Sequence, residues 1–132
     1  MRKKISSLQK RKNNSSSKLW RTKADKAWGQ IIHQDETCLI SDQYCAGKLE
    51  AHHLISRAKV FTRHELINGV LLCSFHHKYS RECSPHMGPI GFADYLQHNE
   101  PAQYQWVLDN KWKTGKPDYK AAYERLMEVL DD

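Results

Sequence analysis

The chain has 132 residues and a formal net charge of +6, a length typical of one domain with a modest core. It has no run of about 18 apolar residues, so no membrane-spanning helix is expected. Its N-terminus lacks an apolar leader, so we expect a cytoplasmic protein whose four cysteines are reduced. Reduced cysteines favour metal ligands over disulfides.

The positive charge is concentrated at the N-terminus. Residues 1–23 contain nine Lys or Arg and no acidic residue, whereas residues 24–132 contain twelve basic and fifteen acidic residues, a balance of −3. We expect residues 1–17 to form a disordered basic tail, because they contain few apolar anchors. A basic arm on a mildly acidic body is typical of contact with DNA, and a solvated tail is the alternative. The tail residues predicted to contact DNA are Lys3, Lys4, Lys10, Arg11 and Lys12.

A helix is predicted from Lys18, at the start of a domain that we place at residues 18–132. Apolar residues recur in this segment at helical spacing and form one face, which we expect to be buried in the core. The residues of this face are Trp20, Ala24, Ala27, Trp28, Ile31 and Ile32.

The rest of the domain divides into a core, residues 38–80, and a helical part, residues 88–131. In the core we expect a loop over 38–47, a strand over 48–54, a basic loop over 56–68, a turn at Asn68-Gly69, a strand over 70–73 and a short helix capped by Ser74. In the helical part we expect helices over 90–98, from Pro101 to Trp112, and from an Asp118 cap onward with Ala122, Leu126, Val129 and Leu130 on its apolar side. The predicted fold class is therefore α+β, with helices around a small two-stranded core.

Cysteine and histidine residues lie on both sides of this predicted hairpin. Cys38 and Cys45 precede the first strand, and Cys73 and His76 follow the second. Two ligands on each side of a hairpin is the arrangement by which a structural zinc ion ties a small motif together. Six residues separate Cys38 from Cys45, more than the usual two to four, so Cys83 is an alternative fourth ligand. The alternative to zinc is that these cysteines are small buried hydrophobic residues.

Two histidine pairs and one asparagine lie close together in this core. An apolar-Ser-Arg run follows the first pair, and the asparagine opens a longer run that ends at the second pair. The two runs are His52-His53-Leu-Ile-Ser-Arg57 and Asn68-Gly-Val-Leu-Leu-Cys73-x-x-His76-His77. The segment resembles the HNH endonuclease family, whose core is a ββα-metal (His-Me) finger. The resemblance covers about residues 38–77, and residues 84–96 look like segments that trail phage-type members.

The resemblance implies a nuclease that hydrolyses DNA phosphodiester bonds with one divalent ion, Mg²⁺ or Mn²⁺, and leaves 5′-phosphate and 3′-hydroxyl ends. His53 takes the general-base position, which suits imidazole because its unperturbed pKa of about 6.5 lies near neutral pH. His52 and His77 take the metal-ligand positions. Asn68 takes the position that holds the loop by side-chain hydrogen bonds, or in some relatives touches the metal. His76 stands where many members have a cysteine, so an exchange of roles between His76 and His77 stays open.

Basic side chains surround this predicted site. Arg57, Lys59 and Arg63 lie on the loop between the strands, where they are expected to hold backbone phosphates without reading sequence. His86 follows a Ser-Pro turn and is either a further ligand, a phosphate contact or a plain surface residue.

Two other functions share the basic tail and the cysteines. One is a non-catalytic, zinc-stabilised DNA-binding module, and the other is an adaptor in a phage or repair complex that docks through its C-terminal helices. Neither function needs His53, Asn68 and His77 together, which favours the nuclease. We expect a monomer or weak dimer, with a phage protein as a candidate partner, located in the host cytoplasm if the chain is phage-encoded.

Overall fold

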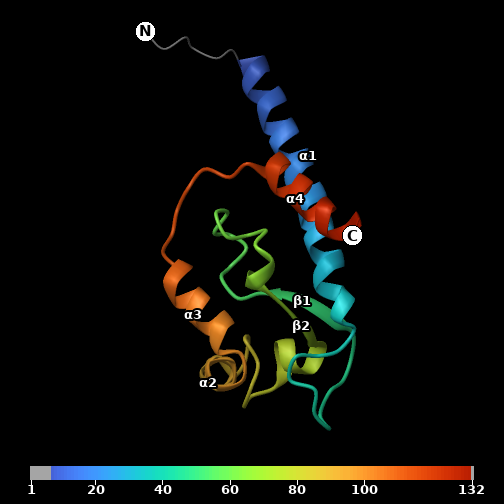
Figure 1. Ribbon diagram of the computed structural model, residues 1–132, viewed down its shortest axis with the longest axis vertical. Coiled ribbons are helices and arrows are strands. Elements are labelled where there is room, and N and C mark those ends of the chain that lie inside the picture. Colours follow the sequence, from blue (N-terminus) through green and yellow to red (C-terminus); the bar gives the residue numbers. More distant parts are fainter. Residues whose placement is uncertain (1–6, 132) are drawn as a thin grey trace.

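The computed structural model describes the backbone of residues 7–131 and the side chains of residues 16–131. Within this range the fold is α+β, as predicted, with one two-stranded antiparallel sheet and four α-helices. Helices α1 and α4 lie side by side, with the sheet near the lower end of α1 and helices α2 and α3 beside it (Figure 1). The elements are α1 (Ser7–Ile32), η1 (His33–Asp35), β1 (Leu49–His53), η2 (Leu66–Asn68), β2 (Gly69–Cys73), η3 (Phe75–Tyr79), α2 (Pro89–Asn99), α3 (Pro101–Asn110) and α4 (Tyr119–Asp131).

Helix α1 begins at Ser7, well before the predicted start at Lys18. The prediction of a disordered tail is therefore wrong for residues 7–17, which are helical. Their Lys, Arg, Gln and Leu residues have good helix propensity, and extending an existing helix needs no new nucleus. Residues 1–6, and with them Lys3 and Lys4, lie outside the described residues. The same holds for the side chains of Lys10, Arg11 and Lys12.

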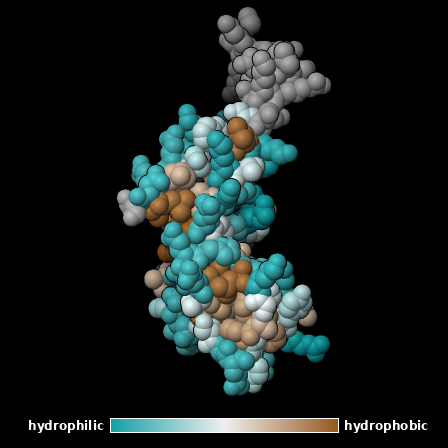
Figure 2. All heavy atoms as spheres, turned by 90° about the vertical axis from the view of Figure 1, so that its right-hand side faces the viewer, coloured by the Kyte–Doolittle hydropathy of each residue, from teal (hydrophilic) through white to brown (hydrophobic). Residues whose placement is uncertain are grey.

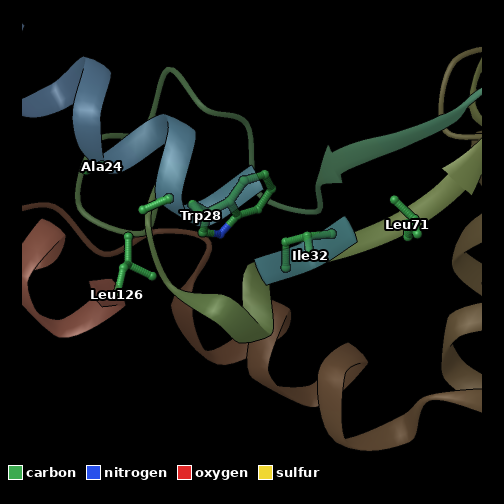
Figure 3. Close-up of a cluster of buried hydrophobic side chains, with 6 residues drawn as sticks. Ala24, Trp28, Ile32, Leu71 and Leu126 are labelled. Carbon is green, nitrogen blue, oxygen red and sulfur yellow. The ribbon is translucent and has the colours of Figure 1, made fainter. Parts of the chain in front are cut away.

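The predicted apolar face of α1 forms the first core cluster. Ala24, Trp28 and Ile32 pack against Leu71 of β2 and Leu126 of α4 (Figure 3). Each large side chain buried in this way contributes about 1.5–3 kcal/mol. The indole nitrogen of Trp28 donates a hydrogen bond to the Glu65 carbonyl at 3.0 Å, so its polar atom is satisfied in the core. This cluster fixes α1 and α4 on one face of the sheet.

The two strands pair from Leu49 opposite Cys73 to His53 opposite Gly69. The predicted turn at Asn68-Gly69 is wrong, because Gly69 is the first residue of β2 with an extended φ of −113°. Glycine is needed there for close packing, since a Cβ would lie 2.6 Å from Trp28 Cζ2 and would also clash with Ile32. Residues 54–68 therefore form a long connection between the strands, and not a tight hairpin turn.

The second core cluster lies on the other side of the sheet. Val70 and Leu72 of β2 pack there with Phe92 and Leu96 of α2. The three predicted C-terminal helices are present, and Asp118 Oδ1 accepts a hydrogen bond from the Ala121 N–H at 3.0 Å as the predicted cap. Ala122 and Leu126 are buried as predicted, but Val129 is 43% exposed, so it does not belong to the apolar face of α4.

The segment after β2 differs from the short α-helix that we predicted. Residues Phe75–Tyr79 form one π-helical turn, in which the Ser80 N–H donates to the Phe75 carbonyl at 2.8 Å. Ser74 does not cap this turn; its hydroxyl donates to the Lys48 carbonyl. Such wide turns are frequent at functional sites, and here the turn carries His76 and His77.

The outer face of α1 and α4 is largely hydrophilic, with separate hydrophobic patches (Figure 2). Among residues 7–131, no helix combines the length and the apolar character needed to cross a bilayer.

Candidate metal centres and active-site cleft

Four side chains from three segments converge at one end of the sheet. The ligand atoms of Cys38, Cys45, Cys73 and His76 all lie within 4.8 Å of one another. His76 Nδ1 is 3.7, 3.5 and 3.2 Å from the sulfurs of Cys38, Cys45 and Cys73, respectively. A sulfur and a nitrogen bound to one tetrahedral zinc ion would lie about 3.6 Å apart. The four ligands predicted from the sequence thus form one cluster that can hold a metal such as zinc.

The surroundings of this cluster affect its thiols differently, since burial raises the pKa of the Cys45 thiol to about 11 while the pKa of the Cys73 thiol is lowered. His76 is 2% exposed, and its Nε2 lies 3.1 Å from Asp42 Oδ2, so Nε2 carries the proton and Nδ1 faces the sulfurs with a lone pair. Burial raises the pKa of the Cys73 thiol, but hydrogen bonds from the backbone N–H groups of His76 and Ala46 outweigh it and lower this pKa to about 7. Thiolate is the form that binds zinc.

The alternative fourth ligand, Cys83, lies outside the cluster. Its thiol donates to the Gly91 carbonyl at 3.8 Å and packs at the edge of the second core. The structure also places His76, and not His77, among the sulfurs. Cys45, and not Cys83, therefore lies with the other two cysteines. His76, and not His77, is the histidine of the cysteine cluster.

A second cluster consists of His52, His77 and His86, and we call it the histidine trio. One ring nitrogen of each lies within 4.8 Å of the others. His77 Nε2 is 3.2 Å from His52 Nδ1, and the rings of His77 and His86 are 4.8 Å apart between centroids. Two nitrogens bound to one ion at about 2.1 Å would lie about 3.0–3.4 Å apart. His52 and His77 therefore have the spacing of two ligands to one divalent ion, and His86 lies close enough to be a third.

The hydrogen bonds of the trio also suit a cation. His77 Nδ1 lies 2.9 Å from Glu50 Oε1, and since a carboxylate only accepts, Nδ1 donates this bond and Nε2 is the ring nitrogen that faces His52. Burial is the main cause that lowers the pKa of His52, to about 3. His52 is then neutral at physiological pH, as a metal ligand must be.

His53 points away from the trio, because successive residues of a strand face opposite sides. Its ring stacks on Trp28 with 3.9 Å between centroids and 8° between planes. Its Nε2 lies 3.0 Å from the Arg63 carbonyl. A carbonyl only accepts, so Nε2 carries the proton and Nδ1 holds the lone pair of the neutral ring. Burial lowers the pKa of His53, which keeps the ring neutral and able to accept a proton near pH 7.

Asn68 ties the loop that surrounds His53. The side chain is fully buried, its Oδ1 accepts from the Ile55 N–H at 2.7 Å, and its Nδ2 donates to the carbonyls of Ile55 and Thr62 at 3.1 and 3.2 Å. Ile55 lies two residues after His53, and Thr62 precedes the residue whose carbonyl orients the His53 ring. The described hydrogen bonds of Asn68 all go to backbone groups of this loop, as the predicted loop-holding role requires.

Arg63 does not have the predicted exposed position. It is only 7% exposed, and its guanidinium makes a bidentate pair with Asp25 at 2.9 and 2.7 Å. His64 Nε2 lies 2.6 Å from Asp25 Oδ1, the oxygen that also accepts from Arg63 Nε. The prediction that Arg63 holds DNA phosphates is therefore wrong, because its guanidinium is buried and ion-paired with Asp25 of α1. The pair instead fixes the segment whose carbonyl orients His53.

A cleft of about 820 Å³ brings the histidines together. His53 and all three trio residues line it, whereas the cysteine cluster does not. Arg57 also lines the cleft and is exposed, which fits its predicted phosphate contact. Lys59 is exposed nearby, with its ammonium 3.2 Å from the Lys111 carbonyl.

Three carboxylates that orient these groups were missed by the sequence reasoning. Asp42 holds His76, Glu50 holds His77, and Asp25 holds Arg63. Only Glu50 could have been found from the sequence. It lies two residues before His52 and therefore on the same face of the strand. Asp25 and Asp42 meet their partners through tertiary contacts that no spacing indicates.

Comparisons of the chain with family models, with curated proteins and with solved structures found no match. The geometry of the cleft and of the two clusters is therefore the evidence for function.

Proposed function

We propose that this protein is a divalent-metal-dependent DNA endonuclease of the HNH type, with β1, β2 and η3 acting as a ββα-metal finger. One observation supports this most strongly. His53, with its tautomer fixed, and the trio of His52, His77 and His86 line the same cleft. A DNA-binding module has no need for a half-buried proton acceptor in the same cleft as a cation site.

In this proposal His53 removes a proton from the attacking water. The proton moves to Nδ1, because Nε2 is already protonated and bound to the Arg63 carbonyl. That carbonyl holds the ring in place during the transfer and stabilises the imidazolium that forms. Trp28 limits rotation of the ring by stacking on it. General-base catalysis of this kind contributes about 10²–10⁴-fold in rate.

The trio of His52, His77 and His86 would hold the divalent ion. Bound there, a divalent ion supplies positive charge that offsets the charge developing on the phosphate and on the leaving 3′ oxygen. Imidazole nitrogen suits first-row transition ions better than Mg²⁺, which prefers oxygen ligands; Mn²⁺ stands lowest in affinity among these transition ions. Of the two predicted alternatives, Mg²⁺ and Mn²⁺, we therefore propose that Mn²⁺ supports faster cleavage.

The cysteine cluster has a structural role in this proposal. A zinc ion held by Cys38, Cys45, Cys73 and His76 would close the coordination shell with four protein ligands, which is typical of structural sites. It would tie the loop before β1 to the turn after β2. His76 is adjacent to His77, so this brace would fix the turn that presents His77 to the trio.

The DNA backbone would be held by Arg57 and Lys59 at the cleft and by the basic N-terminal extension of α1. These contacts carry no base information, so we propose weak sequence preference. One cleft cuts one strand at a time, and a monomer would therefore give nicks first. The products would carry 5′-phosphate and 3′-hydroxyl ends.

Supercoiled plasmid incubated with Mn²⁺ or Mg²⁺ tests the proposal. The wild type is expected to nick the plasmid, and DNA ligase should reseal the nicks without prior phosphorylation. His77→Ala should abolish nicking. His98→Ala should not affect it, since the side chain of His98 is 70% exposed on α2, outside both clusters. If the metal-loaded wild type binds DNA and cuts none, the non-catalytic binding module is the correct function.

A further inference from the structure

An exposed aromatic residue lies close to the cleft. Trp112, just after α3, is 76% exposed, which is unusual for so large an apolar ring. The ammonium groups of Lys59 and Lys111 lie over this ring, 5.0 and 5.6 Å from its centroid. We call these three residues the Trp112 platform. The platform joins two segments, because Lys59 comes from the loop between the strands and also donates to the Lys111 carbonyl.

The charge around this ring is one-sided. Lys113 and Lys116 follow in the same segment, which contains no acidic residue between positions 111 and 117. Within residues 16–131, no carboxylate forms an ion pair with any of these four lysines. An exposed indole ring among lysines without carboxylate partners is complementary to a nucleotide whose base replaces an ammonium group on the ring face and whose phosphate then binds that ammonium group.

The platform is linked along the chain to residues that line the cleft. Val107 of α3 lines the cleft, and Trp112 follows it by five residues, about 8 Å at helical rise. Arg57, two residues before Lys59, also lines the cleft. In Figure 1 the segment between α3 and α4 runs past the loop between β1 and β2, and the ring of Phe61 from that loop lies against Gly115. A strand held by Arg57 can therefore continue onto the platform.

We propose that the Trp112 platform binds an unpaired nucleobase next to the phosphate in the cleft. The preferred substrates are then DNAs with single-stranded segments, such as overhangs, gaps or junctions. A base inside a duplex has both of its faces stacked and cannot lie on an indole ring. This inference rests on the proposed action on DNA and names its substrate class.

Binding measured without added Mg²⁺ or Mn²⁺ tests this inference separately from cleavage. The probes are a fluorescein-labelled 25-nucleotide single strand and its blunt duplex, compared by anisotropy at one fixed salt concentration. We expect Trp112→Ala to weaken binding of the single strand about tenfold and of the duplex less than twofold. Trp112→Phe should recover most of the affinity, because a phenyl ring also stacks. Tyr44→Ala is the matched control, since Tyr44 is 62% exposed in the loop before β1, which supplies the cysteine cluster.

A wild type that binds the duplex as tightly as the single strand would overturn the inference. So would a Trp112→Ala variant that loses equal affinity for both probes or none for the single strand. Single-strand binding that depends on Trp112, in a protein that cuts no DNA, would support the platform and refute the nuclease. The two proposals therefore fail in different ways.

Discussion

Replacing Asn68 by Ala should destabilise the fold by about 3 kcal/mol. The Asn68 side chain makes three hydrogen bonds to backbone groups of the 54–68 loop and is fully buried. Each such bond contributes about 1 kcal/mol net, and the groups left behind have no access to water. At a urea m-value of about 1.5 kcal/mol per molar, the loss corresponds to a midpoint shift of about 2 M. The variant remains folded in buffer if the wild type has the 5–15 kcal/mol of a typical domain.

Urea unfolding followed by circular dichroism measures this loss. Asn99→Ala is the matched control, because the Asn99 amide is exposed and bonds only to the Tyr95 carbonyl within α2, so its loss should stay below about 0.5 kcal/mol. Asn68→Asp should be at least as harmful as Asn68→Ala, since a carboxylate cannot donate to Ile55 and Thr62. A loss below about 1 kcal/mol for Asn68→Ala would show that these hydrogen bonds do not hold the loop.

Three further predictions follow from the contacts of the site. Protein purified without added metal should contain about one zinc per chain by elemental analysis, and Cys73→Ser should lose it; less than about half an equivalent in folded wild type would contradict the zinc assignment. Nicking should be faster in Mn²⁺ than in Mg²⁺ at equal concentration, and the reverse order would argue against nitrogen ligation by the trio. Burial raises the pKa of Asp25, but hydrogen bonds from Arg63 and His64 outweigh it and leave this pKa below its usual 3.8. The stabilisation by ionised Asp25 is thus present above about pH 4 and is lost as the pH falls through the lowered pKa. The difference in unfolding free energy between wild type and Asp25→Asn should therefore shrink below about pH 4. A difference that stays constant with pH would refute the pairing of Asp25 with Arg63 and His64.

The elements with regular spacing could be predicted from the sequence. The buried face of α1, both strands and the Asp118 cap follow from periodicity and capping preferences that depend on near neighbours. Tertiary packing explains the errors. The Asn-Gly pair resembles a turn, but Gly69 is a strand residue that makes room for Trp28. The start of α1 at Ser7 could not be predicted, because residues 7–17 are polar and contain few apolar residues that would mark a helix face.

The part of the site that could be predicted is the part whose residue types have one common role, such as metal binding by clustered cysteines. Three cysteines and a histidine around a hairpin indicate a metal cluster, and the ligands do converge. The sequence did not indicate how charges would pair. Arg63 was expected on the surface because it lies in a basic loop, but Asp25, 38 residues earlier, binds it. The place of His86 in the trio depends on the path of the chain after η3, which no spacing rule gives.

The rate of DNA cleavage by His53→Ala tests the central claim most directly. The measurement is the single-turnover nicking rate of plasmid in Mn²⁺, compared with wild type at matched zinc content and matched urea midpoint. If His53 takes the proton from water, the rate should fall by about 10²–10⁴-fold while DNA binding is unchanged. A variant that cuts within about tenfold of the wild-type rate would contradict the account.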